Sequence, residues 1–390
     1  MGSREVMLVL LCMSSSCLGQ AAQGRGSGAE TQLISGNGLI NLGKRWGSKS
    51  PLMHISANLT EITSIKSLFE FRTLDPEGVV FYGDTKGGAD WFVLGLRGGV
   101  PEMQIGKANT LTSVLGGPKL NDGKWHKVEL RSEGIFVVLE VDGTAALVLG
   151  LHIKNPDDCY LTGQMRLSLG GILSSKLELM NPLQTEMDGC VRAGNWLNIS
   201  APWQLGPNEV LHPCFDEIQK GSYFPGTGLA LFNSSDFPAN QMEDGGAEVK
   251  IQGHSLSWNG TVLSLKGSQD EAVLTITANP QTEELIVKFG TQKGSLKLGP
   301  HTLDLTLSSH EVQVELGQEQ RLNLMDDSHD WVTMWNNGMQ LAFGGVPDDS
   351  DSQWLEGCLS LIQVQGQDVD LDRALHRHSS ISSHSCPFSP

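Results

Sequence analysis

Short runs of alternating apolar and polar residues, separated by turn-forming residues, recur along most of the chain. The segment His126–Arg131 alternates most clearly, with Val128 and Leu130 on one side and charged side chains on the other. A period of two residues is typical of a strand with one buried face. The apolar run Val79–Tyr82 lies between two glycines, as a short strand between turns does. The pattern predicts an all-β chain of antiparallel sandwiches, in which only Asp370–His378 could form a short helix.

A second block of the chain repeats features of the first. Met165–Gly171 (MRLSLGG) corresponds to Met339–Gly345 (MQLAFGG), and each is followed by an acidic residue, a glycine and a cysteine. Two copies of one fold explain this self-similarity. The expected organisation is a signal peptide at 1–19, a flexible segment at 20–50, a first domain at 51–214, a linker at 215–224 and a second domain at 225–386.

The seven cysteines bear on the cellular compartment. Residues 1–19 combine an apolar stretch with small residues, which is typical of a secretory signal, and its removal leaves five cysteines. Secretion makes disulfides the default state of thiols. From the repeat we expect the pairs Cys190–Cys214 and Cys358–Cys386, each closing one domain near its end. Cys159 then remains, either as a free thiol or as an intermolecular link.

Charge and sequence motifs narrow the range of partners. With 44 acidic and 27 basic residues the net charge is −17, which argues against general attraction to nucleic acid or to an anionic membrane. Beyond the signal, no apolar run approaches the length of about 18 residues that a membrane span needs. Four glycosylation sequons agree with secretion; they begin at Asn58, Asn198, Asn233 and Asn259.

Catalytic motifs are missing from the sequence. It has no G-x-S-x-G nucleophile elbow, no H-E-x-x-H zinc motif and no phosphate-binding glycine loop followed by a helix. His376 and His378 come nearest to a metal pair, but their serine-rich surroundings favour a solvated segment. We therefore do not expect an enzyme.

Two features suggest binding instead of catalysis. In Asp75-Pro-Glu77-Gly78 the proline and glycine build a turn on which two carboxylates can converge, as calcium requires, although an ordinary acidic turn would look the same. The apolar strands allow either a closed core or a cavity for a small lipophilic ligand between two sheets. The residues that would line this cavity are Phe92, Ile105, Leu130, Val137 and Met165.

Three segments carry a family resemblance: residues 69–99 (FEFRTLDPEGVVFYGDTKGGADWFVLGLRGG), 121–134 (NDGKWHKVELRSEG) and 140–143 (EVDG). They resemble the laminin G-like domain, which is a β-sandwich of the jelly-roll type. The tandem layout, without Gla or EGF-like modules, resembles the sex hormone-binding globulin family, also called androgen-binding proteins. The resemblance extends over residues 52–390, is stronger in the first domain, and departs from the mammalian pattern as a non-mammalian vertebrate member would.

This resemblance implies a secreted plasma carrier that buries androgens and oestrogens in its first domain. Ser67 stands where the family's serine binds the oxygen on the steroid A ring. Asp90 stands where the family's aspartate binds the hydroxyl at the D-ring end. Phe92 and Met165 match residues of the pocket wall.

The resemblance also implies a structural calcium ion at Asp75 and Glu77, and a homodimer formed through the first domain. At Lys107 the mammalian family has an asparagine that helps to hold the D-ring hydroxyl. Because an ammonium group donates but cannot accept a hydrogen bond, we expect binding to survive with an altered ranking of ligands. Ala108 replaces a histidine implicated in zinc binding, so zinc is not expected, and Asn109 replaces a tryptophan at the entrance. The second domain lacks a counterpart of the acidic turn, and we expect neither calcium nor steroid there.

The alternative hypothesis is a calcium-dependent adhesion or receptor-binding module of the laminin G-like type. Such modules bind their partners at the rim of the sandwich. They have no need of Ser67 and Asp90 inside it, so these two positions distinguish the hypotheses.

Overall fold

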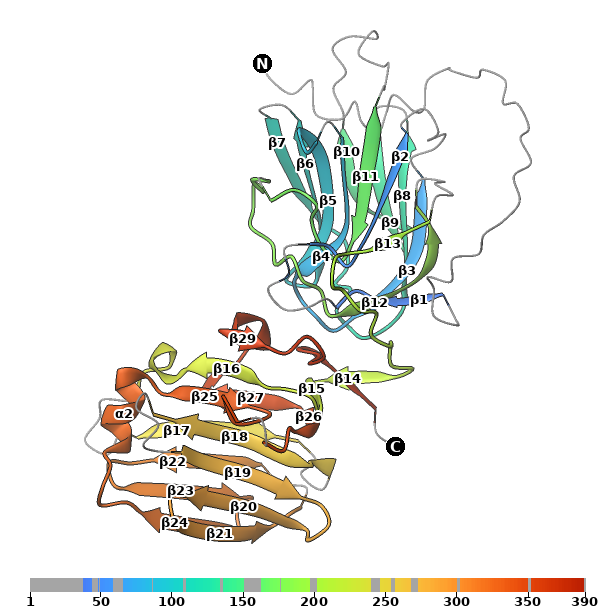
Figure 1. Ribbon diagram of the computed structural model, residues 1–390. Coiled ribbons are helices and arrows are strands. Elements are labelled where there is room, and N and C mark those ends of the chain that lie inside the picture. The colour runs from blue at the N-terminus through green and yellow to red at the C-terminus, as the bar shows by residue number, and fades with distance from the viewer. Residues whose placement is uncertain are drawn as a thin grey trace. The chain divides into compact units, whose positions relative to one another are not determined.

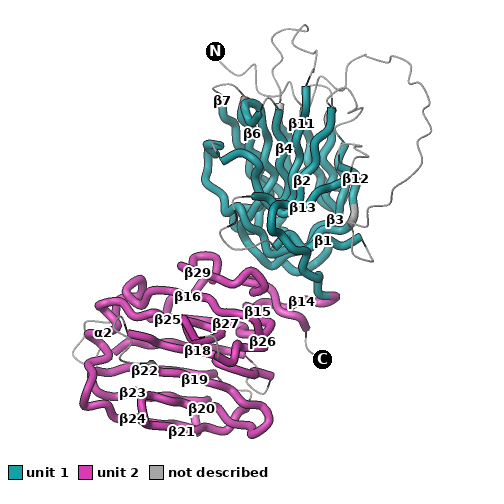
Figure 2. The backbone as a smooth tube through the Cα atoms, viewed as in Figure 1, with its two compact units in different colours: residues 1–215 teal, residues 216–390 magenta. Residues whose placement is uncertain are grey.

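The computed structural model describes residues 38–43, 48, 50–58, 66–85, 87–107, 110–133, 136–150, 163–175, 177–196, 202–239, 246–253, 257–267, 273–299, 302–349 and 352–388. The chain divides into two compact units, residues 1–215 and 216–390 (Figure 2). Each unit contains two antiparallel sheets packed as a sandwich (Figure 1). The predicted all-β fold is therefore confirmed in both units.

The first unit pairs a six-stranded with a seven-stranded sheet. The six-stranded sheet runs β1 (Leu39–Asn41), β12 (Gly189–Asn195), β3 (Ser67–Thr73), β8 (His126–Glu133), β9 (Phe136–Val141), β10 (Thr144–Gly150). The seven-stranded sheet runs β13 (Gln204–Leu205), β2 (Met53–Asn58), β11 (Gln164–Leu169), β4 (Gly78–Thr85), β5 (Asp90–Arg97), β6 (Val100–Lys107), β7 (Thr110–Leu115).

Alternation within these strands places every second side chain between the two sheets. Val128 and Leu130 of β8 are buried there, as predicted, and Phe69 of the neighbouring strand β3 joins the same core. Removing this apolar surface from water is the main stabilising contribution to such a sandwich. A smaller apolar cluster around Tyr82 and Trp91 lies on the other face of the seven-stranded sheet, where it is covered by Ile172, Leu173, Leu177, Leu179 and Leu183.

The second unit repeats this arrangement. Its seven-stranded sheet runs β21 (Gln292–Lys297), β20 (Glu284–Phe289), β19 (Val273–Asn279), β18 (Gly260–Lys266), β25 (Gln340–Phe343), β16 (Ala230–Asn233), β29 (His376–Arg377). Its six-stranded sheet runs β24 (Gln320–Met325), β23 (Glu311–Leu316), β22 (Leu303–Leu307), β17 (Ala247–Gln252), β27 (Leu361–Val364), β28 (Gln367–Asp368). Two short ribbons pair β14 (Ile218–Lys220) with β30 (Ser385–Pro387), and β15 (Ser222–Pro225) with β26 (Glu356–Leu359).

The main strands of the two units correspond. β11 lies between β2 and β4, just as β25 lies between β16 and β18, so Met165–Gly171 and Met339–Gly345 hold equivalent places. The order β3, β8, β9, β10 in the first unit is matched by β17, β22, β23, β24 in the second. The predicted internal repeat is confirmed.

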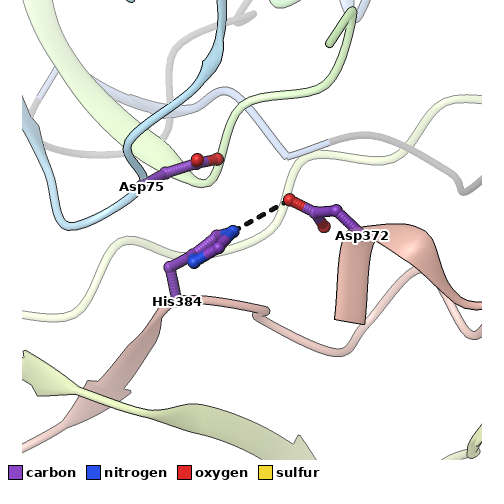
Figure 3. A group of neighbouring side chains, drawn as sticks. All are labelled: Asp75, Asp372 and His384. Atoms are coloured by element: carbon purple, nitrogen blue, oxygen red, sulfur yellow. Dashed lines mark hydrogen bonds and ion pairs between the residues drawn. The ribbon is translucent and has the colours of Figure 1, made fainter. Parts of the chain in front are cut away.

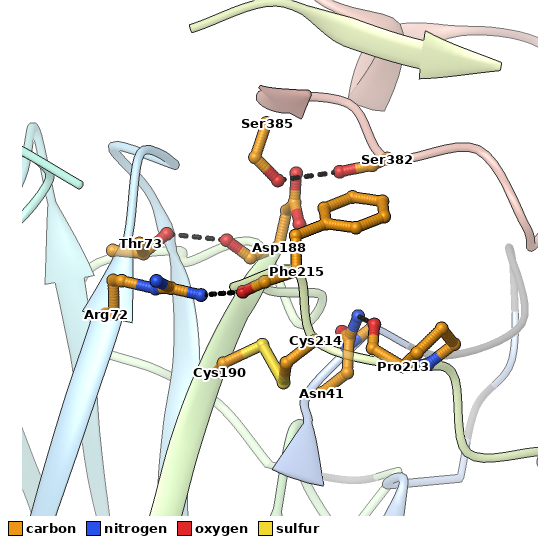
Figure 4. The surroundings of a disulfide bond; sticks show 11 residues. Asn41, Arg72, Thr73, Asp188, Cys190, Pro213, Cys214, Phe215, Ser382 and Ser385 are labelled. Atoms are coloured by element: carbon orange, nitrogen blue, oxygen red, sulfur yellow. Dashed lines mark hydrogen bonds between the residues drawn. A yellow bond between two sulfur atoms is a disulfide. The ribbon is translucent and has the colours of Figure 1, made fainter. Parts of the chain in front are cut away.

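Both predicted disulfides are present. Cys190 bonds to Cys214 (Figure 4), and Cys358 bonds to Cys386, with Cα–Cα separations of 6.2 and 5.9 Å. Beside the first bridge, the guanidinium of Arg72 donates a hydrogen bond to the backbone carbonyl of Phe215 (Figure 4). The bridge and this hydrogen bond together tie the end of the first unit to its six-stranded sheet.

Some strands lie outside the domain bounds expected from the sequence, although the division of the chain after residue 215 falls within one residue of the expected end of the first domain. Inside the segment expected to be flexible, Leu39–Asn41 form β1 and pair with β12, because Ile40 is buried against the core. Inside the expected linker 215–224, β14 pairs with β30 and most of β15 pairs with β26, so both strands belong to the second unit. Strands this short contain too few residues to show an alternating pattern, so they could not be predicted from local periodicity.

The helices also differ from the prediction. The α-helix α2 (Trp331–Gly338) was not anticipated; its N-terminus is capped by Asp330, whose carboxylate accepts the N–H of Thr333 at 3.1 Å. Within Asp370–His378 only a single 3-10 turn forms, η5 (Leu371–Arg373), followed by β29. A further 3-10 turn is η3 (Ser234–Asp236). Two helical turns are too short to establish a 3.6-residue period in the sequence.

Candidate functional site

The polar residues predicted to bind a ligand lie inside the first sandwich. Ser67 begins β3 and has no exposed surface, and it pairs with Leu130 of β8. Asp90 begins β5, is 5% exposed, and pairs with Lys107 at the end of β6. Alternation along β3 puts Ser67 on the same face as Phe69. Along β5 it puts Asp90 on the same face as Phe92, so both polar residues face the core.

The predicted apolar lining belongs to the same core. Phe92, Ile105, Leu130, Val137 and Met165 are all buried members of one cluster. Ser67, Leu130 and Val137 come from the six-stranded sheet, and Asp90, Phe92, Ile105, Lys107 and Met165 come from the seven-stranded sheet. Because neighbouring strands are antiparallel, the starts of β3, β5, β9 and β11 and the end of β6 all lie at one end of the sandwich. The fold thus brings a hydroxyl and a carboxylate to one end of an apolar core from opposite sheets. The side chain of Lys107 lies outside the described residues.

Gly83 fixes the position of one wall of this site. A Cβ atom at Gly83 would lie 2.3 Å from a ring carbon of Phe92 and 2.8 Å from a methyl of Leu167. The Phe92 ring therefore lies directly across the glycine, and it also packs edge-on against Phe81 at a centroid distance of 5.2 Å. A larger residue at position 83 would displace this ring, so the glycine is required for this wall.

The corresponding end of the second core is filled by larger apolar residues. Leu265 replaces Gly83, because Gly83 pairs with Leu167 and Leu265 pairs with the equivalent Leu341. By the same registers Val249 replaces Ser67, because Ser67 pairs with Leu130 and Val249 pairs with the equivalent Leu305. Phe289, in the place of Ile105, packs against the buried indole of Trp331 at 4.9 Å. At this end the second core therefore has neither the hydroxyl of Ser67 nor the glycine across which the Phe92 ring lies in the first.

Thr85 is a candidate that the sequence analysis missed. It is 3% exposed, ends β4, and pairs with Asp90 on one side and Met165 on the other. Alternation from Gly83 directs the hydroxyl of Thr85 to the core. Thr85 lies two residues after Gly83, so the two residues share one face of β4. This spacing points to the site only once the register of β4 shows that Gly83 faces the core.

The acidic turn lies at the opposite end of the first sandwich, between β3 and β4. The carboxylate of Asp75 is buried and accepts two backbone N–H groups, from Glu77 and from Asp188, each at 2.9 Å. Glu77 is only half buried, and its carboxylate accepts the N–H of Gln184 at 3.4 Å. Carboxylate oxygens are hard ligands, so the two acids suit a hard cation that takes further oxygens from carbonyls and water.

A histidine supports the loop that packs beside this turn. The backbone N–H of Gly123 donates to the carbonyl of Thr73 at 3.0 Å. The ring of His126 lies between Asp142 and Asp122, with nitrogen–oxygen distances of 2.8 and 2.9 Å. Burial lowers the pKa of His126, but the hydrogen bonds to both carboxylates outweigh it and hold the pKa above its ordinary value. Donating to both acids requires the imidazolium form.

Among the described residues His376 and His378 belong to no cluster of metal-ligating side chains. The polar cluster in this part of the second unit is centred on Asp372, which accepts a hydrogen bond from Ser383 at 2.6 Å. It also accepts one from His384 at 2.9 Å (Figure 3). Burial raises the pKa of Asp372, but His384 and the positive charge of Arg377 lower it to about 2. This buried ion-pair network holds the C-terminal segment onto the second unit.

The predicted modification sites have different surroundings. Asn58 and Asn259 are exposed, whereas Asn233 is half buried and its side chain caps η3 by accepting the N–H of Ser235 at 3.0 Å. Asn198 and Cys159 lie outside the described residues.

In the part of the chain that the structure describes, no helix is both long and apolar enough to cross a membrane. The Laminin G domain family model matches residues 71–201. The solved structure of mouse laminin alpha1 chain, domains LG4-5, superposes with a TM-score of 0.61 at 16% identity, covering 95% of this chain and 100% of that one. Fold and family model together define a tandem laminin G-like protein.

Curated relatives identify the family within the laminin G-like class. Sex hormone-binding globulin from Oryctolagus cuniculus is 33% identical, with 88% of this chain and 86% of the relative aligned. Sex hormone-binding globulin from Homo sapiens is 34% identical over 88% and 85% of the two chains. The chain belongs to the sex hormone-binding globulin family.

Proposed function

We propose that this protein is a secreted plasma carrier that binds androgens and oestrogens between the two sheets of its first unit. The observation that supports this proposal is the burial of Ser67 and Asp90, on opposite sheets of the first sandwich, among apolar core side chains. A steroid has an apolar ring system with an oxygen at each end, so it needs an apolar enclosure and two separated polar groups.

The two polar residues suit different ligand oxygens. The hydroxyl of Ser67 can donate to a ketone or accept from a phenol on the A ring, which accommodates both steroid classes. The carboxylate of Asp90 can accept from the hydroxyl at the other end, and Thr85 beside it offers a further hydroxyl. Phe92 and Met165 supply apolar walls. No bond of the ligand is broken, and the proposed protein is not an enzyme.

Equilibrium binding of tritiated dihydrotestosterone and oestradiol to the secreted protein tests this function. We expect saturable binding with one site per chain, because the second core is filled at the corresponding end by Phe289 and Trp331. An adhesion module of the laminin G-like type would instead show no saturable steroid binding at micromolar ligand. Two sites per chain would contradict the assignment of the ligand to the first unit.

Lys107 is expected to change the ranking of steroids. Its backbone pairs with that of Asp90, so an ammonium group at this position can donate to an oxygen held beside that carboxylate. We expect Lys107→Asn to reduce the affinity for steroids with a keto oxygen at the D-ring end relative to those with a hydroxyl. Competition binding measures this ratio, and an unchanged ratio would remove Lys107 from ligand selection.

Calcium is proposed at the acidic turn as a structural ion held by Asp75 and Glu77. Asp75 also accepts two backbone N–H groups, so replacing it would destabilise the turn even without calcium. Glu77 gives the cleaner test, because its carboxylate accepts only a long hydrogen bond among those described. We expect calcium to raise the melting temperature of the wild-type protein, and Glu77→Gln to remove that increment. Glu178→Gln, on an exposed residue, is the control, and an equal calcium effect in Glu77→Gln would contradict the site.

A homodimer is proposed through the edge formed by β7 and β10. These edge strands of the two sheets contain no charged residue, and Leu111, Leu115 and Val148 are 41%, 52% and 54% exposed. Open, apolar edge strands are surfaces on which a second copy can pair.

We expect the variant Leu111→Lys/Leu115→Lys to be a monomer that still binds steroid, because charges on an edge strand oppose strand pairing. Sedimentation velocity measures the mass. Met180→Lys, at a residue 55% exposed outside this edge, is the control. A dimer that persists in the double variant would place the contact elsewhere.

A further inference from the structure

We infer that the second unit closes its own sheet edge with glutamine side chains, and that this closure confines self-association to the first unit. The second half of this statement rests on the dimer proposed above. The closure itself is formed by Gln292 and Gln320, on the two edge strands of the second unit.

The edges in question occupy equivalent places in the two units. β7 and β10 end the two sheets of the first unit, and β21 and β24 end the corresponding sheets of the second. All four are outermost strands, so each has one side without a neighbouring strand. Such a strand presents unpaired N–H and C=O groups that can recruit another chain.

In the second unit a side chain takes the place of the missing strand. The N–H of Leu298 donates to Glu283, toward β20, so the backbone groups of the preceding residue, Lys297, point the other way. Gln320 of β24 meets both of them: its Oε1 accepts the N–H of Lys297 at 2.6 Å, and its Nε2 donates to the carbonyl at 2.9 Å. A glutamine amide thus forms the pair of hydrogen bonds that an added strand would form.

The reverse contact closes the other end of the edge. Gln292 of β21 donates from Nε2 to the backbone carbonyl of Met325 on β24 at 2.8 Å. Each edge strand therefore contributes one glutamine side chain that hydrogen-bonds to the backbone of the other strand. Exposed positive charges lie on the same two strands, at Lys293, Lys297 and Arg321.

The first unit lacks these devices at its edge. Of the residues of β7 and β10, none is charged and none is a glutamine. Instead Leu111 and Leu115 expose apolar surface. A chain with one open edge forms a closed pair about a two-fold axis, whereas a chain with two open edges can add copies without end. Closure of the edge of the second unit therefore removes one surface through which further copies could be added.

Four forms of the full-length protein test this inference: wild type, Gln292→Ala/Gln320→Ala, Leu111→Lys/Leu115→Lys, and all four substitutions together. Gln318→Ala is the matched control, since Gln318 is exposed in the turn between β23 and β24. Sedimentation velocity gives the mass of each form, and hydrogen exchange follows the amide of Lys297.

Loss of the two glutamines should speed exchange of the Lys297 amide by about tenfold, as expected for losing a hydrogen bond of about 1.4 kcal/mol. It should also raise the average mass roughly twofold above wild type at micromolar protein, and Gln318→Ala should do neither. With all four substitutions the protein should dimerise through the second unit.

Faster exchange at Lys297 with no gain in mass in either glutamine-free form would overturn the inference, and so would unchanged exchange. If Leu111→Lys/Leu115→Lys alone remains dimeric, the proposed first-unit dimer fails and the confinement to that unit fails with it. The edge closure is then judged separately, by the mass gained when only the glutamines are replaced.

Discussion

Replacing Ser67 by alanine is expected to weaken steroid binding between roughly five- and 150-fold. The hydroxyl is fully buried at the end of an apolar core, so a steroid oxygen bound there loses its hydrogen-bonding partner and cannot regain water. A buried hydrogen bond lost in this way costs about 1–3 kcal/mol, which gives the stated range of affinity. Equilibrium binding of tritiated dihydrotestosterone measures the change directly.

The control for this variant is Ser56→Ala, on an exposed position of β2. Both variants should keep the wild-type melting temperature without ligand to within a few degrees. Only Ser67→Ala should bind less steroid. If Ser67→Ala binds as tightly as wild type, the ligand oxygen is held elsewhere, and Asp90 and Thr85 become the first candidates.

Removing the disulfide of the second unit, as Cys358→Ala/Cys386→Ala, is expected to destabilise that unit by about 3.5 kcal/mol. The two cysteines are 28 residues apart, and the estimate is the chain entropy that opening a loop of this size returns to the unfolded state. For a unit of this size the melting temperature should fall by about 7–14 °C. Differential scanning calorimetry of the full-length protein measures the shift.

The matched variant is Cys190→Ala/Cys214→Ala, which removes the bridge of the first unit with a separation of 24 residues. The loops are of similar size, so the two losses should be similar but should occur in different transitions. Steroid binding should persist in the Cys358→Ala/Cys386→Ala variant. In the Cys190→Ala/Cys214→Ala variant, steroid binding measures whether the first unit remains folded. A single transition shifted equally by both variants would contradict independent stabilisation of the two units.

The strands and their buried faces could be predicted because alternation is local. Val128 and Leu130 face the core as expected. The period of two follows from strand geometry alone and does not depend on which strand lies alongside. The short elements β1, β14 and α2 escaped detection because pairing or packing with distant segments, and not a local pattern, stabilises them.

The internal repeat also determined the disulfides without any structure. Once MRLSLGG and MQLAFGG mark equivalent strands, each acidic-Gly-Cys motif falls at the same place in its unit, and the following cysteine becomes its partner. Of the seven cysteines, two lie in the predicted signal, four form the two bridges, and Cys159 is the odd one. This distribution depends on the order of residues along the chain, which the sequence contains completely.

The candidate site was only partly accessible from the sequence. Family resemblance identified Ser67 and Asp90 as candidates. Only the sheet registers place Thr85 between Asp90 and Met165. The registers also show that Leu265 occupies the position in the second unit that Gly83 has in the first. The sequence by itself determined the fold class, the repeat, the buried faces and the disulfides, because these follow from periodicity and order along the chain. Only the tertiary structure decided which distant side chains meet, including Gln320 with the backbone of Lys297, because such contacts depend on long-range strand pairing.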